Sequence, residues 1–109
     1  MALPFEMDAA EALSYVPDKE WVWIDVREKE EWDSGHLPQA QLISMSTITP
    51  STFDAFPKSQ KMILICRSGA RSLRATLFLR ERGYQQVYNF RGGLLAYNAR
   101  MPQPIPLLH

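Results

Sequence analysis

The segment 62–83 constrains the fold most, because a wholly apolar run leads into a helical pattern with only a short turn between them. Residues 62–65 are apolar at every position, which is typical of a strand buried on both faces of a parallel sheet. Leu73 and Leu77 follow at helical spacing, and Gly83 is placed to end that helix. A buried strand followed directly by a helix predicts an α/β protein with a mainly parallel sheet.

The rest of the chain continues this alternation of strand and helix patterns. We expect strands at residues 21–26, 41–43 and 86–89 in addition to 62–65. We expect helices over residues 9–15 with Asp8 as N-cap and Glu11 completing a capping box, 28–33, 50–56 with Thr49 as N-cap and Pro50 at the first position, and 94–100. In such folds the functional site lies at the carboxyl ends of the strands. Two strands end there in polar sequence, one in Asp25-Val26-Arg27 and the other in Cys66.

The length and composition fit one domain with one core. The chain has 109 residues, of which 46% are hydrophobic. Its single cysteine cannot form an internal disulfide, which is compatible with a reducing compartment. We see no apolar run of about 18 residues and no signal peptide at the start, so we expect a cytoplasmic protein. We expect a domain over residues 1–101 and an extended, Pro-rich tail over 102–109.

The charges of the chain are divided unevenly along its length. Residues 1–54 hold eleven acidic and three basic residues, whereas residues 55–109 hold one acidic and nine basic residues. The net charge of zero argues against general nucleic-acid binding. The division has two interpretations, namely that the halves pair across the fold or that the second half builds a cationic pocket for a small anion.

The segment from Cys66 to Ser72 has the properties of a reactive cysteine loop. The thiolate is the reactive form of cysteine, and a helix that begins just after Cys66 would direct its N-terminal N–H groups at the sulfur. Small residues at 68–70 let several N–H groups converge on one anion. Arg67 and Arg71 add permanent charge and forked donors that suit an oxyanion. The sequence therefore predicts Cys66 as a nucleophile and an anion-binding loop made of Arg67, Ser68, Gly69, Ala70, Arg71 and Ser72.

These residues also have simpler, structural interpretations. A lone cysteine after an apolar strand is commonly a small buried hydrophobe, although two arginines and a glycine in the next five positions make that interpretation poor here. Asp25 and Arg27 are supporting candidates that could contact a loop arginine or line the site, but Arg27 could simply pair with Glu31. His36 is expected to be structural, and no cysteine and histidine spacing suggests a metal site.

Three ordered motifs resemble the rhodanese family. The loop Cys66-Arg67-Ser68-Gly69-Ala70-Arg71 is similar to its Cys-Arg-x-Gly-x-Arg active-site pattern. The run from Ile24 to Glu28, with Glu31-Trp32 and the run from Gly35 to Ala40, resembles its first signature, and the run from Gly83 to Tyr97 resembles its third. Gln39 and Tyr97 depart from the usual glycine and tryptophan, and both lie outside the loop. The resemblance covers roughly residues 5–98.

The resemblance implies a fold and an activity. It implies a three-layer α/β/α domain with a central sheet of about five strands, and a sulfurtransferase that forms a persulfide on Cys66. Thiosulfate or a similar anion would donate sulfur, and cyanide or a thiol, with thioredoxin and glutathione as candidates, would accept it. Arg67 and Arg71 would hold the donor or the departing sulfite. We expect a monomer that needs no cofactor, metal, nucleic acid or membrane.

Two other functions stay open from the sequence. Protein tyrosine phosphatases and arsenate reductases of related fold place five residues between cysteine and arginine, whereas four separate Cys66 from Arg71 here. The shorter loop suits a sulfur atom better than a tetrahedral phosphate. Some rhodanese-like domains are regulatory modules or relay sulfur from another protein instead of using thiosulfate. Many regulatory members lack the loop cysteine, which this chain keeps.

Overall fold

A computed structural model describes residues 3–108 and shows a five-stranded, wholly parallel sheet in the order β1-β5-β4-β2-β3. The strands are β1 (Glu6–Met7), β2 (Trp21–Asp25), β3 (Ala40–Leu42), β4 (Lys61–Ile65) and β5 (Val87–Phe90). The helices are α1 (Ala9–Leu13), α2 (Lys29–Ser34), the 3-10 helix η1 (Met45–Thr47), α3 (Ala70–Glu81) and α4 (Gly93–Arg100). The predicted fold class is confirmed.

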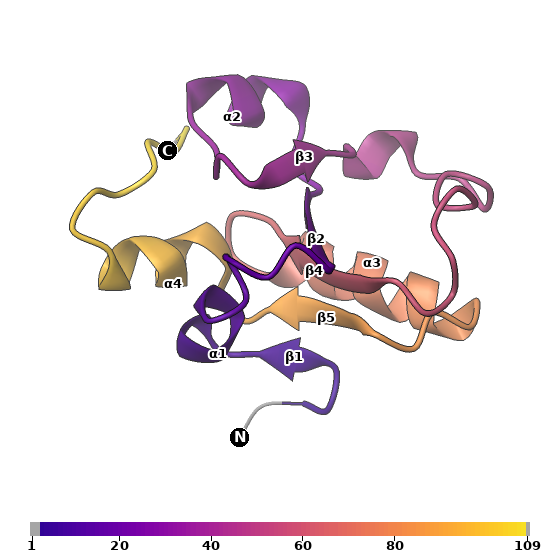
Figure 1. The fold of residues 1–109 in the computed structure, drawn as a ribbon. Coiled ribbons are helices and arrows are strands. Elements are labelled where there is room, and N and C mark those ends of the chain that lie inside the picture. Colours follow the sequence, from indigo (N-terminus) through magenta and orange to yellow (C-terminus); the bar gives the residue numbers. More distant parts are fainter. Residues whose placement is uncertain (1–2, 109) are drawn as a thin grey trace.

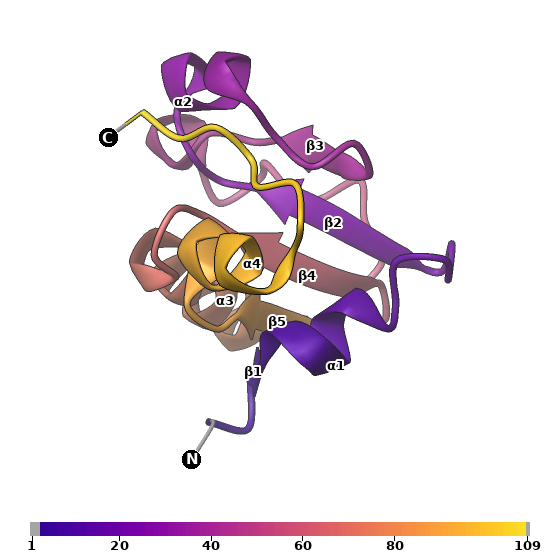
Figure 2. The same cartoon turned by 90° about the vertical axis from the view of Figure 1, so that its left-hand side faces the viewer.

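Helices cover both faces of the sheet and give three layers (Figures 1 and 2). The central strand β4 shows why, because its side chains enter two separate cores. Ile63 and Ile65 join the core beneath α1 and α4, whereas Met62 and Leu64 join the core beneath α3. All four side chains are fully buried. The apolar run that suggested a doubly covered strand is explained by this arrangement.

Most predicted elements are present within one or two residues of the expected bounds. The first helix is capped as expected, because Asp8 Oδ1 accepts a hydrogen bond of 2.9 Å from the Glu11 N–H. The second helix, α2, has a full capping box between Glu28 and Glu31. The strand β1 was not predicted, because two residues are too few to show a period.

The predicted helix over 50–56 is wrong. The segment forms successive turns whose hydrogen bonds span three residues, such as Phe56 N–H to Phe53 O at 2.9 Å. The buried Tyr84 hydroxyl donates to the carbonyls of Phe53 and Phe56, at 2.6 and 3.2 Å. Tertiary contacts therefore take carbonyl groups that a continued helix would need, and they override the helix-start signal at Thr49-Pro50.

The tail after α4 is extended, as predicted, and it is packed on the domain. It runs from the end of α4 across the front of β2 toward α2 (Figure 2). Ile105 and Leu107 are half-buried against the core beneath α1 and α4. The Asn98 amide exchanges two hydrogen bonds with the Ile105 backbone, at 2.8 and 2.9 Å. No helix within residues 3–108 has the length and apolarity to span a bilayer.

Candidate active site

Cys66 lies immediately after β4, at the carboxyl edge of the sheet, and is fully buried. Its Sγ atom accepts hydrogen bonds from the Gly69 N–H at 3.1 Å and the Ser72 N–H at 3.5 Å. The Ser72 hydroxyl also lies 3.3 Å from Sγ. The loop therefore curls around the sulfur and directs donors at it from the start of α3, as the sequence predicted. Such an arrangement stabilises negative charge on sulfur.

The carbonyl groups of the loop face away from this nest of donors. Cys66 O accepts from the Leu94 N–H at 2.9 Å, and Arg67 O accepts from the Leu95 N–H at 3.0 Å. Both donors lie in the first turn of α4. The backbone N–H groups of Arg67, Ser68, Ala70 and Arg71 donate no hydrogen bond to any of the described residues. The loop thus offers further donors to an anion near Cys66.

Gly93 permits this contact between the loop and α4. Its φ is +60°, and a Cβ atom there would lie 2.5 Å from Cys66 O and 2.6 Å from Arg67 O. Any side chain would therefore separate α4 from the loop. The turn at Arg91-Gly92-Gly93 thus holds the active-site loop in place.

Ser72 is the first member of a buried polar chain behind the nucleophile. Its hydroxyl lies 2.6 Å from Asn89 Oδ1, on β5. The Asn89 Nδ2 group donates to Glu6 Oε2 at 2.8 Å and to Gly69 O at 3.2 Å. Glu6 stands opposite Asn89 in the β1–β5 register. Ser72 and Asn89 are almost fully buried, so the bonds of Asn89 to Ser72 and to Gly69 O are shielded from water.

The two loop arginines have different partners. Arg71 forms a two-pronged ion pair with Glu31 of α2, at 2.7 and 2.9 Å. The bond to the Arg71 guanidinium lowers the pKa of Glu31 from 4.5 to about 2, and the same bond raises the pKa of Arg71. The Arg67 side chain makes no hydrogen bond within the described residues, although its Nε is buried. Of the two guanidinium groups, only that of Arg71 is therefore bound by another side chain of the described residues.

Asp25 and Arg27 form a buried ion pair with each other, and neither bonds a loop arginine. Their guanidinium and carboxylate atoms lie 2.9–3.1 Å apart, and both side chains are at most 1% exposed. Arg27 also donates to the carbonyls of Glu31 and Gly35. The simpler interpretation, an Arg27–Glu31 ion pair, is also wrong, because the Glu31 carboxylate binds Arg71 and only the Glu31 carbonyl binds Arg27. The ion pair therefore helps to hold α2, through the bonds from Arg27 to these two carbonyl groups.

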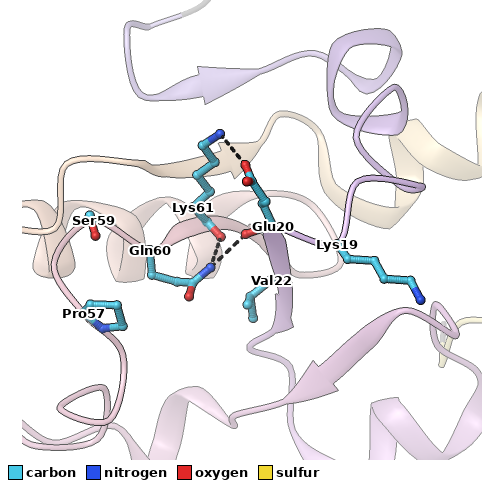
Figure 3. A pocket seen from close by; sticks show the side chains of 7 residues that line it. All are labelled: Lys19, Glu20, Val22, Pro57, Ser59, Gln60 and Lys61. Atoms are coloured by element: carbon cyan, nitrogen blue, oxygen red, sulfur yellow. Dashed lines mark hydrogen bonds and ion pairs between the residues drawn. The ribbon is translucent and has the colours of Figure 1, made fainter.

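The remaining candidates lie outside this cluster. His36 stacks on Trp32 and its Nδ1 lies 2.8 Å from Trp32 O, a structural arrangement as expected. No metal-binding group of three or more His, Cys, Asp or Glu side chains occurs in the part of the chain that the structure describes. A surface hollow of about 410 Å³ lies at the amino ends of β2 and β4, beside the Lys61–Glu20 ion pair (Figure 3). It is at the opposite end of β4 from Cys66.

Sequence reasoning missed Glu6, Glu31 and Asn89 as parts of the site. The one available signal was at Asn89, a polar residue within the otherwise apolar and aromatic strand β5. Glu31 lies within the first of the three motifs, but nothing in that motif indicates that its carboxylate binds Arg71. Glu6 is brought to the site only by strand pairing across 83 residues.

The fold and the site define a class of α/β proteins that carry a cysteine nucleophile in an anion-binding loop at the carboxyl edge of a parallel sheet. Residues 8–100 match the model of the rhodanese-like domain family. The chain belongs to this family.

Relatives of similar length support the assignment. A sulfurtransferase of Allochromatium vinosum is 37% identical over 101 residues, which is 92% of each chain. The putative sulfurtransferase YtwF of Bacillus subtilis is 41% identical over 80 residues, which is 73% of this chain and 76% of the relative. The human single-domain sulfurtransferase TSTD1 shares the fold, with a TM-score of 0.77 at 23% identity over 91% of this chain and 99% of its own. Family and relatives together support sulfur transfer as the general chemistry.

Proposed function

We propose that this protein moves sulfane sulfur from thiosulfate, or a similar small anion, to cyanide or a thiol acceptor through a persulfide on Cys66. The observation that supports this proposal most strongly is the convergence of hydrogen-bond donors on Cys66 Sγ. The same loop has further N–H groups that bind no acceptor among the described residues. Such donors stabilise negative charge first on the thiolate and then on the outer sulfur of a persulfide.

The reaction is a double displacement with a covalent intermediate. The Cys66 thiolate attacks the outer sulfur of thiosulfate, the sulfur–sulfur bond of the donor breaks, and sulfite leaves with the bonding electron pair. The acceptor, cyanide or a thiolate, then attacks the outer sulfur of the persulfide. The new bond forms as the bond to Cys66 Sγ breaks, and the thiolate is restored.

Arg67 and Arg71 serve the anions of this cycle in different ways. The Arg67 side chain makes no hydrogen bond within the described residues and is therefore available to donor or sulfite. Arg71 is held by Glu31, so its guanidinium is fixed in position and its charge is partly balanced. We expect Arg67 to contribute mainly to anion binding. We expect Arg71 to contribute a positive electrostatic field and to fix the geometry of the loop.

The alternative of a phosphatase or arsenate reductase receives less support. The loop holds its sulfur within 3.1–3.5 Å of three donors, and only four residues separate Cys66 from Arg71. Relay from another protein's persulfide uses the same Cys66 chemistry and differs in the donor alone. The nature of the donor is therefore the point that an experiment must decide.

The decisive experiment is the intact mass of the purified protein before and after thiosulfate, and again after cyanide. A gain of about 32 Da, the mass of one sulfur, that cyanide removes and that Cys66→Ser lacks would establish the persulfide cycle. If no gain appears although Cys66 still alkylates, thiosulfate is not the donor. A test with a low-molecular-weight persulfide then separates protein relay from a regulatory module without sulfur chemistry.

A further inference from the structure

The Ser72 hydroxyl behind Cys66 has two possible hydrogen-bond acceptors. The Ser72 hydroxyl lies 2.6 Å from Asn89 Oδ1 and 3.3 Å from Cys66 Sγ. A hydroxyl has a single proton, so it can donate to only one of these atoms at a time. Both distances fit a hydrogen bond, because an O–H···S bond is longer than an O–H···O bond, so Asn89 Oδ1 and Cys66 Sγ are alternative acceptors of this proton.

The orientation of the Asn89 amide is fixed by its other partners. Its nitrogen lies between two acceptors, a carboxylate oxygen of Glu6 at 2.8 Å and the carbonyl of Gly69 at 3.2 Å. Only the NH₂ group can satisfy both, which leaves Oδ1 toward Ser72. Asn89 is 1% exposed, so water does not substitute easily for these contacts.

We propose that Asn89, oriented by Glu6, is a positioning residue that competes with Cys66 for the hydroxyl proton of Ser72. While Cys66 is a thiol, Ser72 donates to Asn89 and can accept from the S–H group. When Sγ becomes a thiolate, the hydroxyl turns and donates to the sulfur. The proton on Ser72 never leaves its oxygen, and the thiol proton goes to solvent.

This exchange of partners would act at both steps of the proposed persulfide cycle, on which the inference rests. Negative charge is on Sγ before it attacks the donor and again when it is the leaving group of the second displacement. In the persulfide the charge is on the outer sulfur, so the hydroxyl can return to Asn89. Ser72 thus supports Sγ only in the states that carry charge.

The test is the rate of Cys66 alkylation by iodoacetamide as a function of pH, which needs no sulfur donor. Ser72→Ala removes the donor to the thiolate and should raise the pH at half-maximal rate by about one unit. Asn89→Ala removes the competing acceptor and should lower that pH by roughly half a unit to one unit. Shifts of opposite sign are the specific expectation. Shifts in the same direction would overturn the competition.

Glu6 provides a second test. Its side chain is partly exposed, so proteins with a substitution at this position should still fold. Glu6→Ala frees the Asn89 amide to turn and should lower the midpoint as Asn89→Ala does. Glu6→Gln keeps an oxygen acceptor for Nδ2 and should stay within about 0.3 unit of the wild type, as should Glu11→Gln, a control for charge on α1. Equal shifts in Glu6→Gln and Glu6→Ala would mean that charge, and not orientation, acts on Cys66.

The other charged groups around the site stay unchanged in the Ser72, Asn89 and Glu6 variants. They are Arg67 and Arg71 of the loop, Glu31 of α2 on Arg71, and the Asp25–Arg27 pair at the end of the neighbouring strand β2. Because alkylation and persulfide mass are measured separately, the outcomes can be told apart. Unshifted midpoints with a normal persulfide cycle refute the role of Asn89 alone, whereas shifted midpoints without a persulfide refute the proposed function.

Discussion

At the scale of single residues, the site depends on contacts that join distant parts of the sequence. Cys66 and the donors of its loop come from one short segment, which is why the motif could be identified without a structure. The atoms that hold this loop come from elsewhere, with Leu94 and Leu95 binding its carbonyls and Asn89 binding Gly69 O. The local sequence therefore indicates the nucleophile but not its support.

Gly93→Ala tests this support where α4 lies closest to the active-site loop. The new Cβ would collide with Cys66 O and Arg67 O at a φ of +60°, so we expect a loss of about 2–4 kcal/mol in the free energy of unfolding and at least a tenfold loss of persulfide formation. Denaturant unfolding and the mass experiment measure the two effects.

Gly83→Ala is the matched control for that variant. Gly83 also has a positive φ, +95°, but the nearest atom to its Cβ would be Lys58 Cδ at 3.9 Å. Backbone strain alone should cost about 1 kcal/mol and leave the chemistry intact. If both variants lost stability and activity equally, close contact between α4 and the loop would not be what Gly93 provides.

At the scale of elements, α2 is coupled to the start of α3 through Glu31 and Arg71. Both side chains are mostly buried, at 19% and 28% exposure, which strengthens the pair relative to a surface pair. The Asp25–Arg27 pair fixes the other side of α2 through the carbonyls of Glu31 and Gly35. Helix α2 contributes no fully buried residue, so these polar contacts carry much of its attachment.

The low pKa of Glu31 predicts a pH-dependent contribution to stability. The folded value is about 2 and the ordinary value is 4.5, so the ion pair stabilises the fold fully above pH 4.5 and is lost as pH falls through about 2. Glu31→Gln should therefore lower the free energy of unfolding by about 1–2 kcal/mol at pH 7, a value reduced for partial exposure. The difference from the wild type should vanish near pH 2.

Urea unfolding at several pH values checks this prediction, with Glu30→Gln as the control. Glu30 lies on the same helix and is exposed, and its side chain makes no ion pair within the described residues. Its variant should differ little from the wild type at any pH. A Glu31→Gln deficit that persisted unchanged at pH 2 would show that packing, not ionisation, explains the loss.

The elements also show where sequence reasoning succeeds and fails. Strands β2 and β4 were predictable because burial on both faces leaves a continuous apolar run, and α3 because its spacing and Gly83 agree. The segment 50–56 failed because the Tyr84 hydroxyl takes its carbonyls from 28 and 31 residues away. The Arg71–Glu31 pair spans 40 residues and carries no local pattern. Contacts of this kind depend on the complete fold.

At the scale of the whole molecule, the two oppositely charged halves of the sequence are joined, and one arginine of the site remains free of them. Two of the four ion pairs among residues 3–108, Lys61–Glu20 and Arg71–Glu31, link the halves. Pairing across the fold thus accounts for part of the charge division. The Arg67 side chain has no such partner among the described residues. The second interpretation, a cationic pocket for a small anion, stays a prediction.

The C-terminal tail belongs to the packing of the whole molecule. A Cβ atom on Gly35 would lie 2.8 Å from Pro106 Cδ, so the tail lies tightly against the end of α2 while Ile105 packs on the core. Ile105→Ser should lower the free energy of unfolding by about 1–2 kcal/mol, because a half-buried apolar side chain is lost.

Leu108→Ser provides the comparison that decides whether the tail is held. Leu108 has the same side-chain chemistry within the same segment but is 38% exposed, so its substitution should change stability by no more than about 0.5 kcal/mol. Thermal unfolding of both variants distinguishes a packed tail from a solvated one. Equal and small effects would mean that the tail is not held against the domain. A larger loss in Ile105→Ser, with normal alkylation of Cys66, would place the tail in the scaffold and outside the chemistry.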